Sequence, residues 1–361
     1  MMASLSRDSL IPAHVLWVLL VCAPAFASDP DLSALEAKFA RIIASGPSGR
    51  AAGGEVGVAL IHIESGSRLS IHGDRRFPMA SVYKLPLAIE LLTQVSQGSL
   101  ALTQPVTIRV NDIRACCTLS RKYPKGGVTM TAGELLELLM VYSDNTACDL
   151  LMKLVGGPAV VERRMRMLGF AAINVNRYEG EIALEMTGVR QRLSEADWTL
   201  ELERRLISEV PADELRAARA RYTSDARDTS TPDDMALLLA RLQKGDLLPR
   251  AYTDLLLDLL TRAKTGPARL KALLPIETQV AHKTGTTEVV INDVGIITLP
   301  ETGATRGHLV LAVFVMNGAR VTQMQQTIAQ IAGAAFESFT GKPLPAKPKP
   351  KPAHKKRGRR R

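Results

Sequence analysis

Strand-like segments lie near both ends of this chain, whereas the long stretch between them is helical. The strand-like segments are 55–63, 68–72, 278–285, 289–299 and 309–315. Because a strand must pair with other strands, the early and late segments are expected to pair with one another. We therefore expect an α/β (α+β) protein with an antiparallel sheet assembled from both termini and flanked by helices, plus an all-α lobe built by the middle of the chain.

Apolar residues at helical spacing predict the helices. The expected helices cover 29–45, 81–97, 321–339 and much of 131–260. Residues 64–67, Glu-Ser-Gly-Ser, are typical of a hairpin between the first two strand-like segments. We expect one domain over 28–340.

The two ends of the chain differ in composition from its body. Arg7, the apolar stretch 15–21 and the small residues around Ala27 resemble a secretory signal, so we expect 1–27 to be removed and the protein to be secreted into the periplasm. The net charge of +10 equals the Lys and Arg content of 341–361, which contains no acid. This Pro-Lys tail is expected to be disordered. It either keeps the protein soluble or binds anionic envelope polymers or lipid head groups. Nucleic acid is not an expected partner of an exported protein.

Three cysteines remain after signal cleavage: Cys116, Cys117 and Cys148. An odd number cannot all pair within one chain. One bridge to Cys148 can form in an oxidising compartment, but the sequence does not decide it. The histidines form no cluster with metal-ligand spacing, so no metal or other cofactor is expected. They are His14, His62, His72, His282, His308 and His354.

The first motif with catalytic chemistry is Ser81-Val82-Tyr83-Lys84. A serine hydroxyl is a poor nucleophile until a base removes its proton. On a helix, positions i and i+3 share a face, so the amine of Lys84 can lie beside the Ser81 hydroxyl. This spacing alone is common in proteins, so the motif needs support from elsewhere in the chain.

Two further motifs provide that support. Ser143-Asp144-Asn145 lies between two predicted helices, where its hydroxyl can relay a proton and its amide can hold a substrate amide; such residues also cap helices. Lys283-Thr284-Gly285 lies on a predicted strand. Lys and Thr there can bind a carboxylate, and Gly allows a close approach to the backbone, although an ordinary edge strand would look the same.

In this order, the three motifs resemble the signature of class A β-lactamases and penicillin-binding proteins. The chain is similar to class A β-lactamases from about Asp29 to Phe339. The stretches 77–84, 265–271 and 282–286 resemble the extended-spectrum branch of that class most. The resemblance implies a serine β-lactamase/penicillin-binding-protein-like fold and a monomer that hydrolyses the β-lactam ring of small-molecule antibiotics without a cofactor.

The family's mechanism implies a role for each residue that handles protons. Ser81 attacks the lactam carbonyl, and Lys84 and Glu179 manage its proton; either of them can be the acylation base. Ser143 delivers a proton to the lactam nitrogen. Glu179 then activates the water that deacylates the enzyme.

The resemblance also implies how the substrate is held. Asn145 binds the side-chain amide, and the backbone N–H groups of Ser81 and Thr286 form the oxyanion hole. Gly285 belongs to the same substrate-binding strand. The residues implied to bind the substrate carboxylate are Lys283, Thr284, Thr286 and Arg269.

Residues 177–181, Arg-Tyr-Glu-Gly-Glu, resemble the start of the family's omega loop, and 227–232 resemble its end. The resemblance implies an ion pair between Arg177 and Asp228 that joins the two ends of the loop. It also implies a cis peptide bond between Glu179 and Gly180.

Two features depart from the family. The position four residues after Glu179 is Ala183, where the family usually has an Asn that helps to hold the hydrolytic water. The loop is also much longer than usual, with a surplus of about 188–224.

Helical spacing of Trp198, Leu202 and Leu206 in this surplus, with an expected ion pair between Glu201 and Arg205, predicts a helical pair packed near the loop.

Two other functions share part of this pattern. A penicillin-binding DD-peptidase or transpeptidase has the three motifs but lacks the deacylating Glu, and Glu179 argues against it. A β-lactam or peptidoglycan binding protein would be acylated once and stall. Ala183, the surplus segment and the basic tail are compatible with that alternative.

Overall fold

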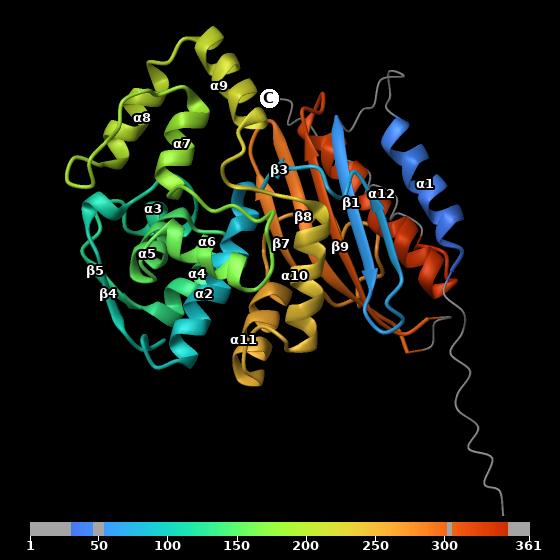
Figure 1. Cartoon of the computed structure of the whole chain (residues 1–361). Helices are drawn as coiled ribbons and strands as arrows, with labels where there is room; N and C mark the ends of the chain where they lie inside the picture. The colour runs from blue at the N-terminus through green and yellow to red at the C-terminus, as the bar shows by residue number, and fades with distance from the viewer. Residues whose placement is uncertain (1–29, 46–53, 302–304, 346–361) are drawn as a thin grey trace, which may run out of the picture.

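A five-stranded antiparallel sheet in the order β2-β1-β9-β8-β7 forms one half of the molecule (Figure 1). The computed structural model describes residues 30–45, 54–301 and 305–345. The strands of this sheet are β1 (Glu55–His62), β2 (Arg68–Ile71), β7 (Val280–Thr286), β8 (Val290–Leu299) and β9 (Gly307–Met316). Since β1 from the first part of the chain pairs with β9 from the last, the predicted assembly from both termini is confirmed.

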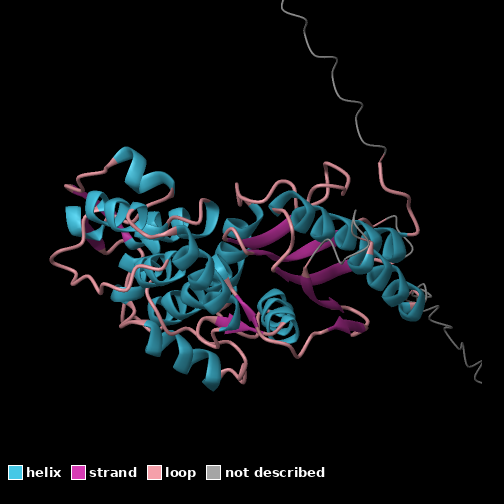
Figure 2. Ribbon diagram, turned by 90° about the horizontal axis from the view of Figure 1, so that it is seen from above, coloured by secondary structure: helices cyan, strands magenta, loops and turns pink. Residues whose placement is uncertain are grey.

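Helices cover both faces of the sheet, because alternate strand residues are apolar toward opposite sides. In β1, Val56, Val58 and Leu60 pack with Phe39 of α1 (Leu32–Ala44) and with α12 (Val321–Thr340). The intervening β1 residues belong to a larger core cluster on the other side. The sheet therefore lies between two helical layers, as Figure 2 shows from above.

The larger core joins the sheet to the helical lobe. Its longer helices are α2 (Lys84–Ser96), α4 (Ala132–Val141), α5 (Asn145–Leu154), α6 (Pro158–Met167), α10 (Pro232–Lys244) and α11 (Arg250–Thr261). Shorter elements are η1 (Ala80–Tyr83), η2 (Val110–Asp112), α3 (Cys117–Lys122), α7 (Glu179–Thr187), and the strand pairs β3 (Phe77–Pro78) with β6 (Thr229–Ser230) and β4 (Pro105–Ile108) with β5 (Val128–Thr131). The catalytic motifs lie where this lobe meets β7.

The surplus segment forms two helices beside α7, α8 (Leu200–Ser208) and α9 (Ala212–Ser224), which confirms the predicted helical pair (Figure 1). Trp198 precedes α8 and is only 4% exposed, packed in a small apolar cluster with Leu184 and Val189. The expected Glu201–Arg205 pair is wrong, because Arg205 instead lies 4.0 Å from Glu209, one turn toward the C-terminus.

The predicted signal, 1–27, and most of the basic tail, 346–361, lie outside the described residues. Helix α12 ends at Thr340, where Gly341 has a positive φ of +67°. In the described part of the chain, no helix has both the length and the apolar character that crossing a bilayer requires.

Candidate active site

Ser81 lies in the 3-10 turn η1, which leads directly into α2. The sequence predicted a single helix over 81–97, but its first turn is wound more tightly. In a 3-10 turn, residues i and i+3 lie nearly above one another. The Nζ atom of Lys84 is accordingly 3.1 Å from the Oγ atom of Ser81. Ala80, directly before Ser81, has a φ of +46°, a strained conformation for a residue with a Cβ.

The buried amine of Lys84 joins the first two motifs to the omega loop. Its Nζ donates to the backbone O of Ser143 at 2.8 Å and to Oδ1 of Asn145 at 2.7 Å. It also lies 3.6 Å from Oε2 of Glu179. Without its third proton, the Nζ atom of Lys84 can accept the hydroxyl proton of Ser81 instead of donating a hydrogen bond to it. The position therefore suits both charge stabilisation and proton transfer.

Glu179 is the first residue of α7, and its Oε2 accepts a hydrogen bond from the Tyr83 hydroxyl at 2.7 Å. Burial, followed by the nearby Cys148 and Glu179, raises the pKa of Tyr83 well above its usual value. The tyrosine therefore stays protonated and acts as a fixed donor to the carboxylate. Sequence reasoning missed Tyr83, because it occupies an unspecified position of the Ser-x-x-Lys motif.

The peptide bond between Glu179 and Gly180 is trans, as are all peptide bonds of the described residues, so the implied cis bond is wrong. The N–H groups of Glu179 and Gly180 both donate to the carboxylate of Asp149, at 2.7 and 3.2 Å. A single acceptor thus satisfies two of the free N–H groups at the start of α7.

Asp149 is in turn held by Arg114, whose Nε lies 2.8 Å from Oδ2, with both side chains buried. Burial raises the pKa of Asp149, although the positive charge of Arg114 opposes this shift. The guanidinium of Arg114 lies 4.1 Å from the ring centre of Trp198, which precedes α8. The surplus segment therefore packs against the support beneath Glu179. The sequence signal for this role of Asp149 was the presence of a carboxylate within the mostly apolar stretch 147–152.

The third motif reaches the second through Lys283, which is fully buried in β7. Its Nζ donates to Oγ of Ser143 at 2.8 Å and to the backbone O of Thr284 at 3.0 Å. Burial and, next, the positive charge of Lys84 lower the pKa of Lys283 well below its usual value. Ser143 itself has a φ of +60°. The three motifs therefore converge on one group of side chains.

Gly285 is needed for a reason that the sequence did not reveal. A Cβ at this position would collide with the backbone O of Met79, so the glycine lets β7 lie against the turn that carries Ser81. Thr286, the next residue of β7, is exposed.

Arg269 lies behind this strand and is 3% exposed. It donates to the backbone O of Gly285 at 3.1 Å, to the backbone O of Asn292 at 2.8 Å and to Oγ1 of Thr286 at 2.6 Å. Burial lowers its pKa. Arg269 therefore contacts the exposed part of β7 through the hydroxyl of Thr286.

The two ends of the omega loop are joined by the predicted ion pair. Nε of Arg177 lies 2.6 Å from Oδ2 of Asp228, and their side chains are 5% and 2% exposed. Oδ1 of Asp228 also accepts the N–H groups of Asn176 and Arg177, at 2.7 and 3.2 Å. Asp228 has a φ of +51°, a conformation that Asp and Asn tolerate better than most residues.

We expect Asp228→Asn to lower the free energy of unfolding by about 1.5–3 kcal/mol, the range for a hydrogen bond to a charged group. The loss is not larger because Glu185 and Asp225 still contact Arg177, at 2.6 and 3.2 Å. The asparagine keeps the backbone conformation and the amide acceptor, so the loss reports the charge. Chemical denaturation measures it. Arg250→Gln, which removes an exposed ion pair with Asp254 away from the loop, should change stability by less than about 1 kcal/mol. Equal stability of Asp228→Asn and the unmodified protein would contradict this account.

The cysteines pair differently from the one bridge that was considered. Cys116 and Cys117 form a disulfide between adjacent residues, and Cys148 is a free, buried thiol. The sulfur of Cys148 lies 3.1 Å from the Tyr83 hydroxyl. Cys148 thus lies inside the lobe beside Tyr83 and takes no part in the bridge.

The described residues contain no group of three or more His, Cys, Asp or Glu side chains placed to hold a metal ion. His282 and Asp293, both fully buried, are joined at 2.8 Å across β7 and β8. The polar groups around Ser81 are those of acyl transfer: a nucleophile, an adjacent amine, a carboxylate and a second hydroxyl.

Comparison with known proteins gives consistent results. A family model described as "Beta-lactamase enzyme family" matches residues 34–339. The extended-spectrum β-lactamase PER-1 of Pseudomonas aeruginosa is 30% identical over 78% of this chain and 82% of its own length. The carbapenem-hydrolysing β-lactamase KPC of Klebsiella oxytoca is 31% identical over 73% of this chain and 76% of its own length.

Solved structures agree with these relatives. A β-lactamase from Chitinophaga pinensis DSM 2588 superposes with a TM-score of 0.69 and 30% identity, over 84% of this chain and 98% of that structure. The likeness therefore covers both the sheet and the helical lobe.

Proposed function

The chain belongs to the class A family of serine β-lactamases, and on that premise we propose how its own residues open and hydrolyse a β-lactam ring. The chain is a hydrolase that acts through a serine acyl-enzyme. The relatives support this reading and neither the DD-peptidase nor the stalled binding protein. The assignment of steps to individual residues below is the proposal.

In acylation, Oγ of Ser81 attacks the lactam carbonyl and gives up its proton through Lys84, with Glu179 close enough to share this role. The observation that carries the assignment is the position of the Lys84 amine, 3.1 Å from Ser81 and 3.6 Å from Glu179. The developing oxyanion is held by the N–H groups of Ser81 and Thr286. As the C–N bond breaks, Ser143 gives its proton to the nitrogen and takes up the proton that Lys84 received from Ser81, while Lys283 stabilises the negative charge that develops on the Ser143 oxygen.

Substrate binding follows from the same geometry. Lys283 supplies positive charge for the carboxylate, Thr284 and Thr286 supply hydroxyls, and Arg269 orients the Thr286 hydroxyl from behind. Asn145 accepts from Lys84 through its amide oxygen and donates to Ala115 through its amide nitrogen. A substrate amide would bind alongside this fixed side chain.

In deacylation, a water between Glu179 and the acyl carbonyl loses its proton to the carboxylate and attacks the ester. The Tyr83 hydroxyl holds the carboxylate oxygen that faces Lys84, at 2.7 Å. The ester bond breaks, the proton held by Glu179 passes to the leaving oxygen of Ser81 through Lys84, and the product acid leaves.

Turnover of nitrocefin tests this reading. Many turnovers per enzyme are expected, with a colour change that continues at a steady rate. A single equivalent of product followed by no further reaction would identify a stalled acyl-enzyme and contradict the proposal.

The replacement of Asn by Ala183 gives a separate prediction. Ala183 lies one helical turn after Glu179 in α7 and has no hydrogen-bonding side chain. We expect Ala183→Asn to raise the deacylation rate constant roughly tenfold, part of the 10²–10⁴-fold that positioned proton transfer supplies. Acylation, which consumes no water, should change little.

Pre-steady-state kinetics separate the two rate constants for Ala183→Asn. The matched control is Ala183→Leu, which adds similar bulk without a hydrogen-bonding group and should not accelerate deacylation. An unchanged deacylation rate for several substrates in Ala183→Asn would mean that Glu179 and Ser81 already hold the water well enough.

We propose that the domain spans 28–340 and that the 1–27 segment directs export to the periplasm, supported by its charge and apolar pattern. The basic segment 341–361 is proposed to bind anionic envelope polymers, and the enzyme to act as a monomer. Size-exclusion chromatography coupled to light scattering, with and without the tail and a soluble polyanion, tests the last two points.

A further inference from the structure

Cys116 and Cys117 form a disulfide between neighbouring residues at the rim of the active site, and both have positive φ angles, +88° and +78°. L-residues with a Cβ rarely adopt this conformation, and two in succession are rarer. The bond closes a small ring around a single peptide unit. We infer that the ring holds both residues at positive φ and that two free cysteines would relax to negative φ.

The residue before the ring contacts the second catalytic motif. The backbone O of Ala115 accepts a hydrogen bond from Nδ2 of Asn145 at 3.2 Å. The other end of that amide, Oδ1, accepts from Lys84 at 2.7 Å. Ala115 thereby fixes which way the Asn145 amide faces.

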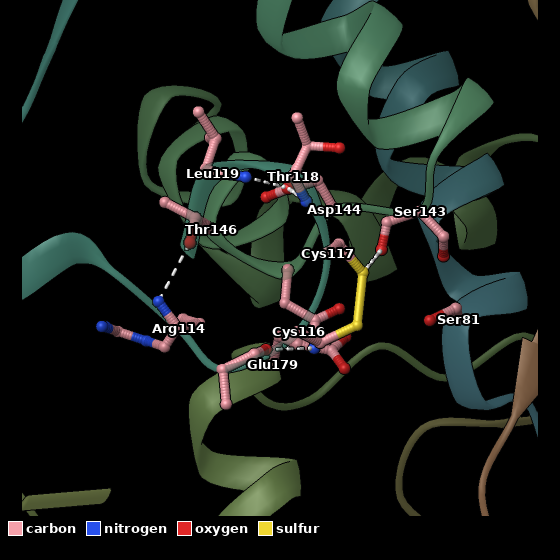
Figure 3. The surroundings of a disulfide bond; sticks show 12 residues. Ser81, Arg114, Cys116, Cys117, Thr118, Leu119, Ser143, Asp144, Thr146 and Glu179 are labelled. Carbon is pink, nitrogen blue, oxygen red and sulfur yellow. Dashed lines mark hydrogen bonds between the residues drawn. A yellow bond between two sulfur atoms is a disulfide. The ribbon is translucent and has the colours of Figure 1, made fainter. Parts of the chain in front are cut away.

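The residues after the ring contact the same motif from the other side. The N–H groups of Thr118 and Leu119 both donate to Oδ2 of Asp144 at 2.8 Å. Sγ of Cys117 lies 3.7 Å from the backbone O of Ser143 (Figure 3). The same backbone O also accepts a hydrogen bond from Lys84. The ring thus sets the spacing between Ala115, which binds Asn145, and the segment 118–119, which binds Asp144.

We propose that the Cys116–Cys117 disulfide is a positioning element of the β-lactam site, which orients the Asn145 amide through the carbonyl of Ala115. The proposal rests on the proposed function, in which Asn145 binds the side-chain amide of the substrate. It makes the enzyme sensitive to dithiols, because Cys116 is exposed.

Reduction by a dithiol proceeds by two exchanges. One reductant sulfur attacks Sγ of a cysteine and breaks the S–S bond, which leaves one free cysteine and a mixed disulfide. The second reductant sulfur then displaces the other cysteine. The reductant is oxidised to its cyclic disulfide, while Cys116 and Cys117 gain two electrons and two protons.

Opening the ring should affect binding of the substrate amide more than the fold. Asp144 still caps α5 through the Ala147 N–H at 3.0 Å, and the buried Arg114–Asp149 pair does not involve the ring. Ala115, in contrast, directly precedes the two residues that relax. We therefore expect Asn145 to lose its fixed orientation while the nucleophile turn stays in place.

The test compares two penicillins on the purified, mature enzyme before and after treatment with dithiothreitol. Benzylpenicillin carries the side-chain amide and 6-aminopenicillanic acid does not. We expect reduction to lower kcat/KM for benzylpenicillin by about tenfold or more, since small misplacements of a positioning group can cost up to about 10²-fold. The value for 6-aminopenicillanic acid should change less than about twofold on the same scale. Reoxidation should restore the first value.

Alkylation and peptide mass spectrometry should show two new thiols, at Cys116 and Cys117, and thermal melting should show that the reduced enzyme stays folded. The Cys116→Ser/Cys117→Ser variant should have the kcat/KM values of the reduced enzyme, and dithiothreitol should not change them. Cys148 is already a thiol, so dithiothreitol does not change it.

Three results would overturn the proposal. They are verified reduction with unchanged kcat/KM, an equal loss of kcat/KM for both penicillins, and free thiols at both Cys116 and Cys117 before treatment. An oxidised enzyme that turns over neither penicillin would instead refute the proposed function.

Discussion

Replacing Ser81 with alanine is expected to lower kcat for nitrocefin by about 10⁶-fold, the scale seen when the nucleophile of a serine hydrolase is removed. Without Oγ, the amine of Lys84 has no hydroxyl to deprotonate, and no ester can form. Groups that act as one unit are not additive, so a further change of Lys84 should cost little more. Steady-state assays at high enzyme concentration measure the residual rate.

The matched control for this variant is Ser96→Ala, which removes an exposed hydroxyl at the end of α2 that donates to the backbone O of Thr93. It should retain full activity. Thermal melting should show that Ser81→Ala is folded. A folded Ser81→Ala enzyme with more than about a hundredth of normal kcat would contradict nucleophilic catalysis by Ser81, since general acid–base effects alone supply 10²–10⁴-fold.

Replacing Glu179 with glutamine is expected to slow deacylation by about 10²–10⁴-fold, because the amide cannot accept the proton of the attacking water. Glutamine keeps the shape of the side chain, and its oxygen can still accept the Tyr83 hydroxyl. The ester on Ser81 should therefore accumulate. The expected time course is a burst of one equivalent of product followed by very slow turnover.

Stopped-flow absorbance resolves this burst, and its rate constant also reports the acylation base. The control is Glu181→Gln, two residues along the same helix, where the exposed carboxylate binds the N–H of Tyr178. That change should leave the steady rate nearly unaffected. Full steady turnover by Glu179→Gln, with no accumulated ester, would assign the deacylating base to another group.

The elements that the sequence predicted best have strong local patterns. Nearly continuous apolar runs rich in β-forming residues in 55–63 and 309–315 identified β1 and β9. Since strands must pair, pairing across the chain was the expectation. The motif residues could be identified because their chemistry limits which side chains can serve. Ser81, Ser143 and Lys283 are far apart in sequence, and the structure brings them into one network through Lys84.

The features that the sequence did not predict depend on tertiary contacts. Arg269 is implied by the resemblance to bind the substrate carboxylate, and that role stays a prediction. A pattern of residue types could not show that its guanidinium also binds the backbone O atoms of Gly285 and Asn292. The peptide after Glu179 is trans, and the N–H groups of Glu179 and Gly180 both bind Asp149, about 30 residues earlier in the chain, a contact that no local pattern could indicate. The bond between Cys116 and Cys117 needs a backbone conformation that composition alone does not favour.

The central claim is that hydrolysis passes through an ester on Ser81. The direct measurement is mass spectrometry of the wild-type enzyme quenched during turnover of a slowly hydrolysed penicillin, followed by peptide mapping. We predict an added mass of one intact substrate on the peptide that contains Ser81, appearing within the burst and disappearing as the substrate is consumed. Sustained hydrolysis without any adduct, or an adduct on a different residue, would contradict the claim.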